Sequence, residues 1–201
     1  MGLAMSASPL TRASLLLRIR DPRNRIAWGE FVELYAPLVH AYGMKHGLQD
    51  ADAADLAQEV LRRVARSVGD FEYDPARGKF RGWLFTMTRN ELSKFVVRNA
   101  KKAKGSGDTQ VHEVLAQQPE RAPDEEEWDR EYQWTVFHWA AERVRQEFRE
   151  ATWQAFWLTA VGGREAADVA RELNVSVGAV YIARSRVTAR IRQEIQTVEG
   201  D

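Results

Sequence analysis

Hydrophobic residues recur along most of the chain at intervals of three and four positions, the spacing of one face of a helix. In the segment between Asp50 and Gly69 they form a single stripe: Leu56, Val60, Leu61, Val64 and Val68. Asp50 or Asp52 suits the N-cap of this helix, and Gly69 suits its C-terminal end. The segment is therefore predicted to be an amphipathic helix with one buried face.

Further helices are predicted on both sides of this segment. Asp21-Pro22 favours a helix start, and Pro37 interrupts that helix because proline lacks the N–H and clashes with the preceding turn. A second short helix is then predicted from Pro37 to His46. Beyond the segment, a helix is expected from Phe80 toward Arg98 on the stripe Trp83, Leu84, Met87, Leu92, Phe95 and Val96. Four helices can share one core, and a short helix containing Leu15, Leu16, Leu17 and Ile19 can pack on it.

The periodicity disappears over residues 99–123, where Lys, Gly, Ser, Gln and Pro predominate, so this stretch is predicted to be a flexible linker. The acidic run at 124–127 then favours a helix start, since carboxylates are stabilised at the helix N-terminus. Five of the seven tryptophans lie between 128 and 157 and are expected to fill a small core rather than stack on a ligand. The prediction is an all-α chain with two small helical domains, 1–98 and 124–201.

The segment from Arg164 to Ile191 has the pattern of a helix-turn-helix. Its first helix has an inward face of Val169, Ala170 and Leu173, and its second has Val180, Ala183, Val187 and Ile191. Between them Asn174 accepts a left-handed backbone and Ser176 caps the second helix. Helix pairs of this kind also occur in proteins that do not bind nucleic acid.

Composition narrows the class of protein. Of 201 residues, 44% are apolar and 29% charged, as in soluble globular chains, and no stretch approaches the roughly 18 to 20 apolar residues of a membrane-spanning helix. The absence of cysteine excludes disulfides, thiolate nucleophiles and cysteine-based metal sites. We therefore expect a cytoplasmic protein that does not insert into membranes.

The zero net charge conceals an uneven distribution. Residues 1–104 carry 18 basic and 11 acidic side chains, whereas residues 105–150 carry 5 and 12. Between Arg77 and Lys104 there are nine basic residues and one acidic residue, Glu91. Such a concentration is typical of a surface that binds a polyanion, although a solvated helix face has the same composition.

Catalysis has little support in the sequence. The four histidines are scattered along the chain, and no zinc-protease, nucleotide-binding or hydrolase-elbow motif is present. We expect neither an enzyme nor a bound cofactor or metal. The carboxylates of Asp52, Asp55 and Glu59 fall on one helix face, but no histidine stands nearby and Arg62 and Arg63 can neutralise them.

Several motifs together resemble the extracytoplasmic-function sigma factors, the small two-domain specificity subunits of bacterial RNA polymerase. The segment from Asp52 to Val60 is similar to the polymerase-binding helix of that family, and the segment from Phe80 to Asn90 to its promoter-melting helix. The segment from Ala170 to Arg186 resembles the domain that reads the upstream promoter element. The resemblance covers residues from about 24 to 98 and from 130 to 195.

The resemblance implies core RNA polymerase and promoter DNA as partners, and an anti-sigma factor as a further candidate. Polymerase-binding candidates are Asp52, Asp55, Gln58, Glu59 and Arg62. Candidates for the downstream element are Lys79, Arg81, Arg89, Asn90, Lys94 and Arg98, with Asn90 facing an extruded base. Candidates in the helix-turn-helix are Ser176, Tyr181, Arg184, Ser185, Arg186 and Arg190. Many relatives carry an aspartate in place of Lys94, so the promoter bases cannot be carried over.

Two other functions remain open at this stage. One is a helix-turn-helix regulator that binds duplex DNA without polymerase, and the other is an all-helical adaptor between proteins. The acidic residues Glu113, Glu120, Asp124 and Glu125 either mimic nucleic acid within polymerase or form a solubilising spacer.

Overall fold

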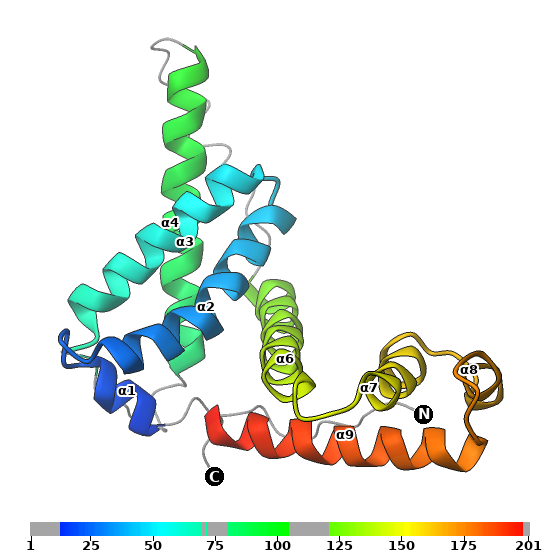
Figure 1. Cartoon of the computed structure of the whole chain (residues 1–201). Helices are drawn as coiled ribbons and strands as arrows, with labels where there is room; N and C mark the ends of the chain where they lie inside the picture. Colours follow the sequence, from blue (N-terminus) through cyan, green and yellow to red (C-terminus); the bar gives the residue numbers. More distant parts are fainter. Residues whose placement is uncertain (1–12, 70, 72–79, 105–120, 199–201) are drawn as a thin grey trace. The chain divides into compact units, whose positions relative to one another are not determined.

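The computed structural model describes residues 13–69, 71, 80–104 and 121–198, and every regular element in this part of the chain is a helix (Figure 1). The predicted all-α fold is therefore confirmed. The chain divides into two compact units between Thr135 and Val136. None of the helices in these ranges combines the length and the apolar character needed to cross a membrane.

The described residues of the first unit form four helices and the first half of a fifth: α1 (Ala13–Ile19), α2 (Arg25–Lys45), α3 (Asp50–Ser67), α4 (Phe80–Lys104) and α6 (Arg121–Arg145). As predicted, α1 is a short helix that buries Leu15, Leu16 and Ile19, but Leu17 is exposed.

The helix α2 is continuous through Pro37, so the predicted break into two helices is wrong. It also begins a turn later than expected, because Asn24 is its N-cap and accepts a hydrogen bond from the N–H of Ala27 at 3.1 Å. Pro37 faces solvent, while Tyr35 and Tyr42 on either side of it are buried in one core. Burial of this continuous stripe outweighs the hydrogen bond that proline removes.

The helices α2 and α3 pack closely at Gly43. A Cβ atom at this glycine would lie 3.1 Å from Leu56 and 3.3 Å from Ala53. The predicted stripe of α3 is buried except at Leu61, which is half-buried. The N-cap of the helix is Gln49, so neither aspartate caps it. Asp50 and Asp52 instead lie in the first turn, where the helix dipole stabilises a carboxylate.

The first half of α6 packs on the other helices of the first unit through two buried rings, Trp128 and Tyr132. The ring of Tyr132 stacks 6.1 Å from that of Tyr35, and the ring of Trp128 lies 5.4 Å from Tyr42 and 5.5 Å from Phe85. The division between the units therefore falls within α6, whereas the sequence placed the start of a second domain at residue 124.

The segment predicted as a linker, 99–123, is helical at both ends. The helix α4 continues to Lys104, beyond the expected end near Arg98, and α6 begins at Arg121. Residues 105–120 lie outside the described part of the chain.

The second unit contains the rest of α6 with α7 (Glu150–Phe156), the π-helical turn η1 (Trp157–Val161), α8 (Ala166–Glu172) and α9 (Val177–Val198). One core cluster joins α6, α7 and α9 through Ala140, Ala141, Val144, Trp153, Phe156, Val187 and Ile191. A second joins α7, α8 and α9 through Ala155, Val169, Ala170, Val180 and Ala183. Trp128 and Trp153 are thus core residues, as predicted for these aromatics, whereas Trp134 is 52% exposed.

Candidate nucleic-acid interface

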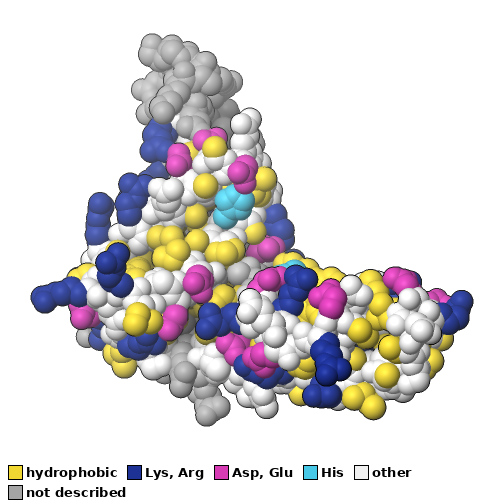
Figure 2. Space-filling model, in the orientation of Figure 1, with side chains coloured by type: hydrophobic (Ala, Val, Ile, Leu, Met, Phe, Trp, Pro, Cys, Tyr) yellow, Lys and Arg dark blue, Asp and Glu magenta, His cyan; other side chains and the backbone are white. Residues whose placement is uncertain are grey.

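Four polar side chains predicted to bind nucleic acid lie on α4, and we call them the α4 surface: Arg89, Asn90, Lys94 and Arg98. Asn90, Lys94 and Arg98 are exposed, and Arg89 is half-buried. Because Asn90, Lys94 and Arg98 are four residues apart, they follow one row along the helix. Figure 2 shows Lys and Arg side chains along the left edge of the molecule, over α3 and α4.

Three cations within or beside this surface contact neighbouring side chains: Lys94, Arg98 and Arg63. The carboxylate of Glu91 is buried, and its Oε1 lies 3.0 Å from Nζ of Lys94 and 2.8 Å from Nε of Arg63 on α3. The guanidinium of Arg98 lies 4.7 Å from the ring centre of Phe95. One buried carboxylate thus ties α3 to α4 and leaves a net positive charge around it.

Arg81 does not belong to the α4 surface, which corrects the sequence prediction. Its side chain is 3% exposed because the first half of α6 covers it. The guanidinium lies 4.4 Å from the ring centre of Tyr132 and 3.4 Å from the carboxylate of Asp129. Lys79 falls outside the described residues.

The candidate polymerase contacts lie on the solvent side of α3, and we call them the α3 polar face: Asp52, Asp55, Gln58, Glu59 and Arg62. Asp55, Gln58 and Arg62 are exposed, and the other two are half-buried. Glu59 is paired with Arg62 at 3.3 Å, and Nε of Arg62 donates to the backbone oxygen of Gln58 at 3.3 Å. Across the described ranges no cluster of acidic or histidine side chains is arranged to hold a metal ion.

In the second unit, the turn between α8 and α9 has the local geometry expected from its sequence. Asn174 has a φ of 53°, in the left-handed region that asparagine tolerates. The Oγ of Ser176 accepts a hydrogen bond from the N–H of Ala179 at 3.1 Å at the start of α9. Val169 and Val180 are buried between the two helices.

Five of the six residues predicted to bind DNA in this unit are exposed, and we call them the α9 surface: Ser176, Tyr181, Arg184, Ser185 and Arg186. The sixth, Arg190, forms a fork of two 2.7 Å hydrogen bonds with Glu147 and a further one of 3.0 Å with Glu194. These bonds, chiefly those with Glu147, raise the pKa of Arg190. Because its donors are used within the unit, we leave Arg190 out of the α9 surface; its side chain is 31% exposed, and its predicted contact with DNA stays a prediction.

Residues 31–102 match the sequence family described as Sigma-70 region 2. This range runs from Phe31 in α2 through most of α4, so it contains both the α3 polar face and the α4 surface. Over this range the chain is similar to region 2 of the sigma-70 family. The predicted resemblance to sigma factors is therefore confirmed for this part of the chain.

The chain is also similar to an individual sigma factor. The ECF RNA polymerase sigma factor RpoE of Cereibacter sphaeroides is 35% identical to this chain over 77 residues. The alignment covers 38% of this chain and 41% of the relative, so the chain spans about two fifths of the relative's length.

Beyond the sigma-70 region 2 segment, the sequence reasoning overlooked an exposed apolar residue, Ile182 on α9. It is 60% exposed and lies between Tyr181 and the buried Ala183. Its side chain carries no hydrogen-bond donor, whereas all the other candidates in the second unit carry one. The available signal was its position opposite the buried stripe of α9.

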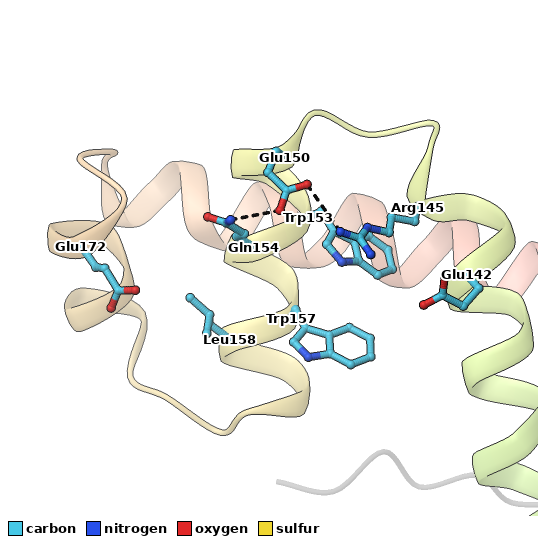
Figure 3. Close-up of a pocket in the computed structure, with 8 residues that line it drawn as sticks. All are labelled: Glu142, Arg145, Glu150, Trp153, Gln154, Trp157, Leu158 and Glu172. Atoms are coloured by element: carbon cyan, nitrogen blue, oxygen red, sulfur yellow. Dashed lines mark hydrogen bonds and ion pairs between the residues drawn. The ribbon is translucent and has the colours of Figure 1, made fainter.

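An open pocket of about 400 Å³ in the second unit is lined by Glu142, Arg145, Glu150, Trp153, Gln154, Trp157, Leu158 and Glu172 (Figure 3). The rings of Trp153 and Trp157 stack with their centres 5.6 Å apart. Glu150 accepts a hydrogen bond from Gln154 at 3.0 Å and lies 3.9 Å from Arg145. The residues that line the pocket include no pair of nucleophile and base.

Proposed function

We propose that the chain is a sigma factor that binds core RNA polymerase and directs it to promoters. In this proposal the α3 polar face contacts polymerase, and the α4 surface recognises the downstream element and holds its opened strand. The α9 surface reads the upstream element as a duplex. The observation that carries the proposal is the exposed row of Asn90, Lys94 and Arg98 within the sigma-70 region 2 segment.

The α4 surface has the chemistry that a separated DNA strand requires. The exposed amide of Asn90 offers two donors and an acceptor to a base edge, while Arg89, Lys94 and Arg98 supply charge for phosphates. A hydrogen bond is worth about 0.5–1.5 kcal/mol, and one to a charged group about 1.5–3 kcal/mol, so several together are comparable with the few kcal/mol lost when a base leaves the stack. Binding energy alone can therefore support local opening without ATP.

Aromatic stacking from Trp83 makes a smaller contribution in this proposal. Trp83 is half-buried, and its ring lies 4.8 Å from that of Phe71 and 5.3 Å from that of Phe80. These neighbours occupy part of its surface. Asn90 and the surrounding cations therefore carry the proposed recognition of the opened strand.

The α3 polar face suits a protein partner better than nucleic acid. Asp52, Asp55 and Glu59 would repel phosphates, whereas carboxylates and an amide can pair with basic and polar side chains across a protein interface. The charges of α3 and α4 therefore favour different partners for two neighbouring helices.

The α9 surface suits duplex DNA. Arg184 and Arg186 can donate to guanine edges or phosphates, and the N-terminal turns of the second helix are the part of a helix-turn-helix that enters the major groove. Ser176 orients these turns through the cap that it makes.

A binding experiment with three components separates this proposal from its alternatives. The purified chain is mixed with core RNA polymerase, with a pool of promoter-containing duplexes, and with both together. We expect it to co-elute with polymerase, to bind duplex weakly alone, and to retain selected duplexes when polymerase is present. Asp55→Arg should weaken co-elution, whereas the exposed control Ile26→Ala on α2 should not.

Tight duplex binding by the chain alone would instead favour a free-standing helix-turn-helix regulator. Failure to bind either polymerase or DNA would favour a protein adaptor. Both results would overturn the proposal.

A further inference from the structure

The side of α9 that faces away from the core of the second unit is apolar or small near its N-terminus. Gly178, Ile182, Ser185 and Ala189 are spaced by four, three and four residues, so they follow one helical row, and all four are exposed. The opposite row consists of the buried residues Val180, Ala183, Val187 and Ile191. The row farthest from the core therefore carries no charge along three turns.

Large apolar side chains are also concentrated at this end of the unit. Val175 is 37% exposed, Val177 41%, Tyr181 57% and Ile182 60%. One exposed apolar side chain is ordinary on a protein surface, but four within eight residues indicate a contact surface.

The charges on α9 indicate what this surface contacts. From Val177 to Gln193 the charged residues are all arginines, and the first acidic residue is Glu194. Arg184 and Arg186 are exposed beside the apolar row. Figure 2 shows Lys or Arg and hydrophobic side chains next to one another over α9 at the lower right. This surface matches a polyanionic partner. The partner would carry negative charge at its edges and small apolar groups between them.

The major groove of DNA is such a partner. Phosphates line its edges, and the C5-methyl group of thymine is the apolar group on its floor. Gly178, Ser185 and Ala189 are small enough to let the helix backbone approach that floor, and Ile182 projects from the middle of their row.

We propose that Ile182 is a specificity-determining residue that contacts a thymine methyl group in the upstream element. The inference rests on the proposed function of the α9 surface and adds the chemical feature of the DNA that it reads. Replacing thymine with uracil removes this methyl group and leaves every hydrogen-bonding group of the base in place.

The test uses the full chain bound to core RNA polymerase. A duplex retained by this complex is first selected from a random pool, and it is then resynthesised with uracil at single upstream thymines. For the wild-type chain we expect at least one position where uracil weakens binding about fourfold, the effect of losing one buried methyl group.

Variants at Ile182 and at a control position test whether the loss of binding with uracil depends on Ile182. Ile182→Ala should bring the thymine-to-uracil ratio at that position close to one, while Ile182→Val should keep most of it. Ile26→Ala, a control on α2 that is 73% exposed, should keep the wild-type ratio. Because Ile182 is exposed, all variants should have the same circular dichroism spectrum and melting temperature.

The possible failures can be distinguished. An upstream element that is selected but shows no loss with uracil, or the same loss in Ile182→Ala as in the wild type, would overturn this inference alone. If the complex selects no upstream element, the proposed function of the α9 surface fails and the inference fails with it.

Discussion

At the scale of single residues, the guanidinium of Arg81 is buried and contacts an aromatic ring and a carboxylate instead of water. It lies over Tyr132 and beside Asp129, and it is 3% exposed. A buried cation is tolerated only where such neighbours replace solvent. Its contacts therefore join α4 to α6 within the first unit.

Arg81→Ala is expected to lower the free energy of unfolding by about 1–3 kcal/mol, because packing and charge contacts are lost together. Urea unfolding of the full chain, followed by tryptophan fluorescence, measures the change. The matched control is Lys94→Ala on the same helix, whose side chain is 60% exposed and should cost less than about 1 kcal/mol. Equal effects of the two substitutions would contradict the structural role of Arg81.

Asn90→Ala should reduce promoter opening about tenfold, because a base edge loses its hydrogen bonds to the exposed amide. Binding to core polymerase should remain unchanged, since Asn90 is outside the α3 polar face. Permanganate reactivity of unpaired thymines reports the opening, and co-elution reports the binding. Equal opening by the variant and the wild type would refute the role proposed for Asn90.

At the scale of elements, the first half of α6 is held by both rings and charges. Trp128 packs against Tyr42 and Phe85, and Nζ of Lys45 lies 2.5 Å from Glu131 and 3.6 Å from Glu127. The acidic start of this helix thus belongs structurally to the first unit.

Trp128→Ala should destabilise the first unit by about 3–5 kcal/mol, the range for truncating a buried aromatic side chain. Trp134→Ala, in the same helix, removes a side chain that is 52% exposed and should cost about 1 kcal/mol or less. Thermal unfolding of the two variants provides the comparison. Similar melting temperatures for both would show that α6 is not packed on the first unit.

The ion pair of Lys45 predicts a pH dependence. Hydrogen bonding to Glu131 raises the pKa of Lys45 above its ordinary value of 10.5. The pair therefore stabilises the folded chain fully below that pH, and its contribution is lost as the pH rises through the raised pKa.

Glu131→Gln should accordingly cost less than about 1 kcal/mol at pH 7, because Lys45 is 45% exposed. The difference from the wild type should shrink above pH 10.5. Denaturant midpoints at pH 7 and in alkaline buffer measure it, and a difference that grows with alkalinity would contradict the assigned pair.

The positions of the helices could be predicted from the sequence more readily than the helices that each face packs against. The stripe of α3 could be identified because its period depends only on local spacing. The burial of Arg81 could not, since periodicity predicts that α6 has an apolar face but not which helices that face covers. Pro37 predicts a break because the cost of proline within a helix depends on the sequence alone, whereas the core that offsets this cost depends on α3 and α4.

The same distinction applies to the candidate sites. Asn90, Lys94 and Arg98 are predicted from the sequence as contacts to the downstream element, and their side chains are exposed. Arg190 has the same chemistry, but its pairing with Glu147 depends on a tertiary contact between residues 43 positions apart. Ile182 was missed because it carries no hydrogen-bonding group.

At the scale of the whole molecule, the chain has two compact helical units, and we propose that they bind different forms of DNA. The first unit carries the sigma-70 region 2 segment and is proposed to hold an opened strand. The second is proposed to read an intact duplex. Neither role produces a transcript unless core RNA polymerase supplies the catalytic centre.

Transcription in vitro from a genomic fragment library, with start sites mapped, tests this account most directly. We predict that defined start sites appear only when the chain and core RNA polymerase are both present, and that these sites share an upstream and a downstream element. The same start sites with polymerase alone, or no new start sites when the chain is added, would contradict it.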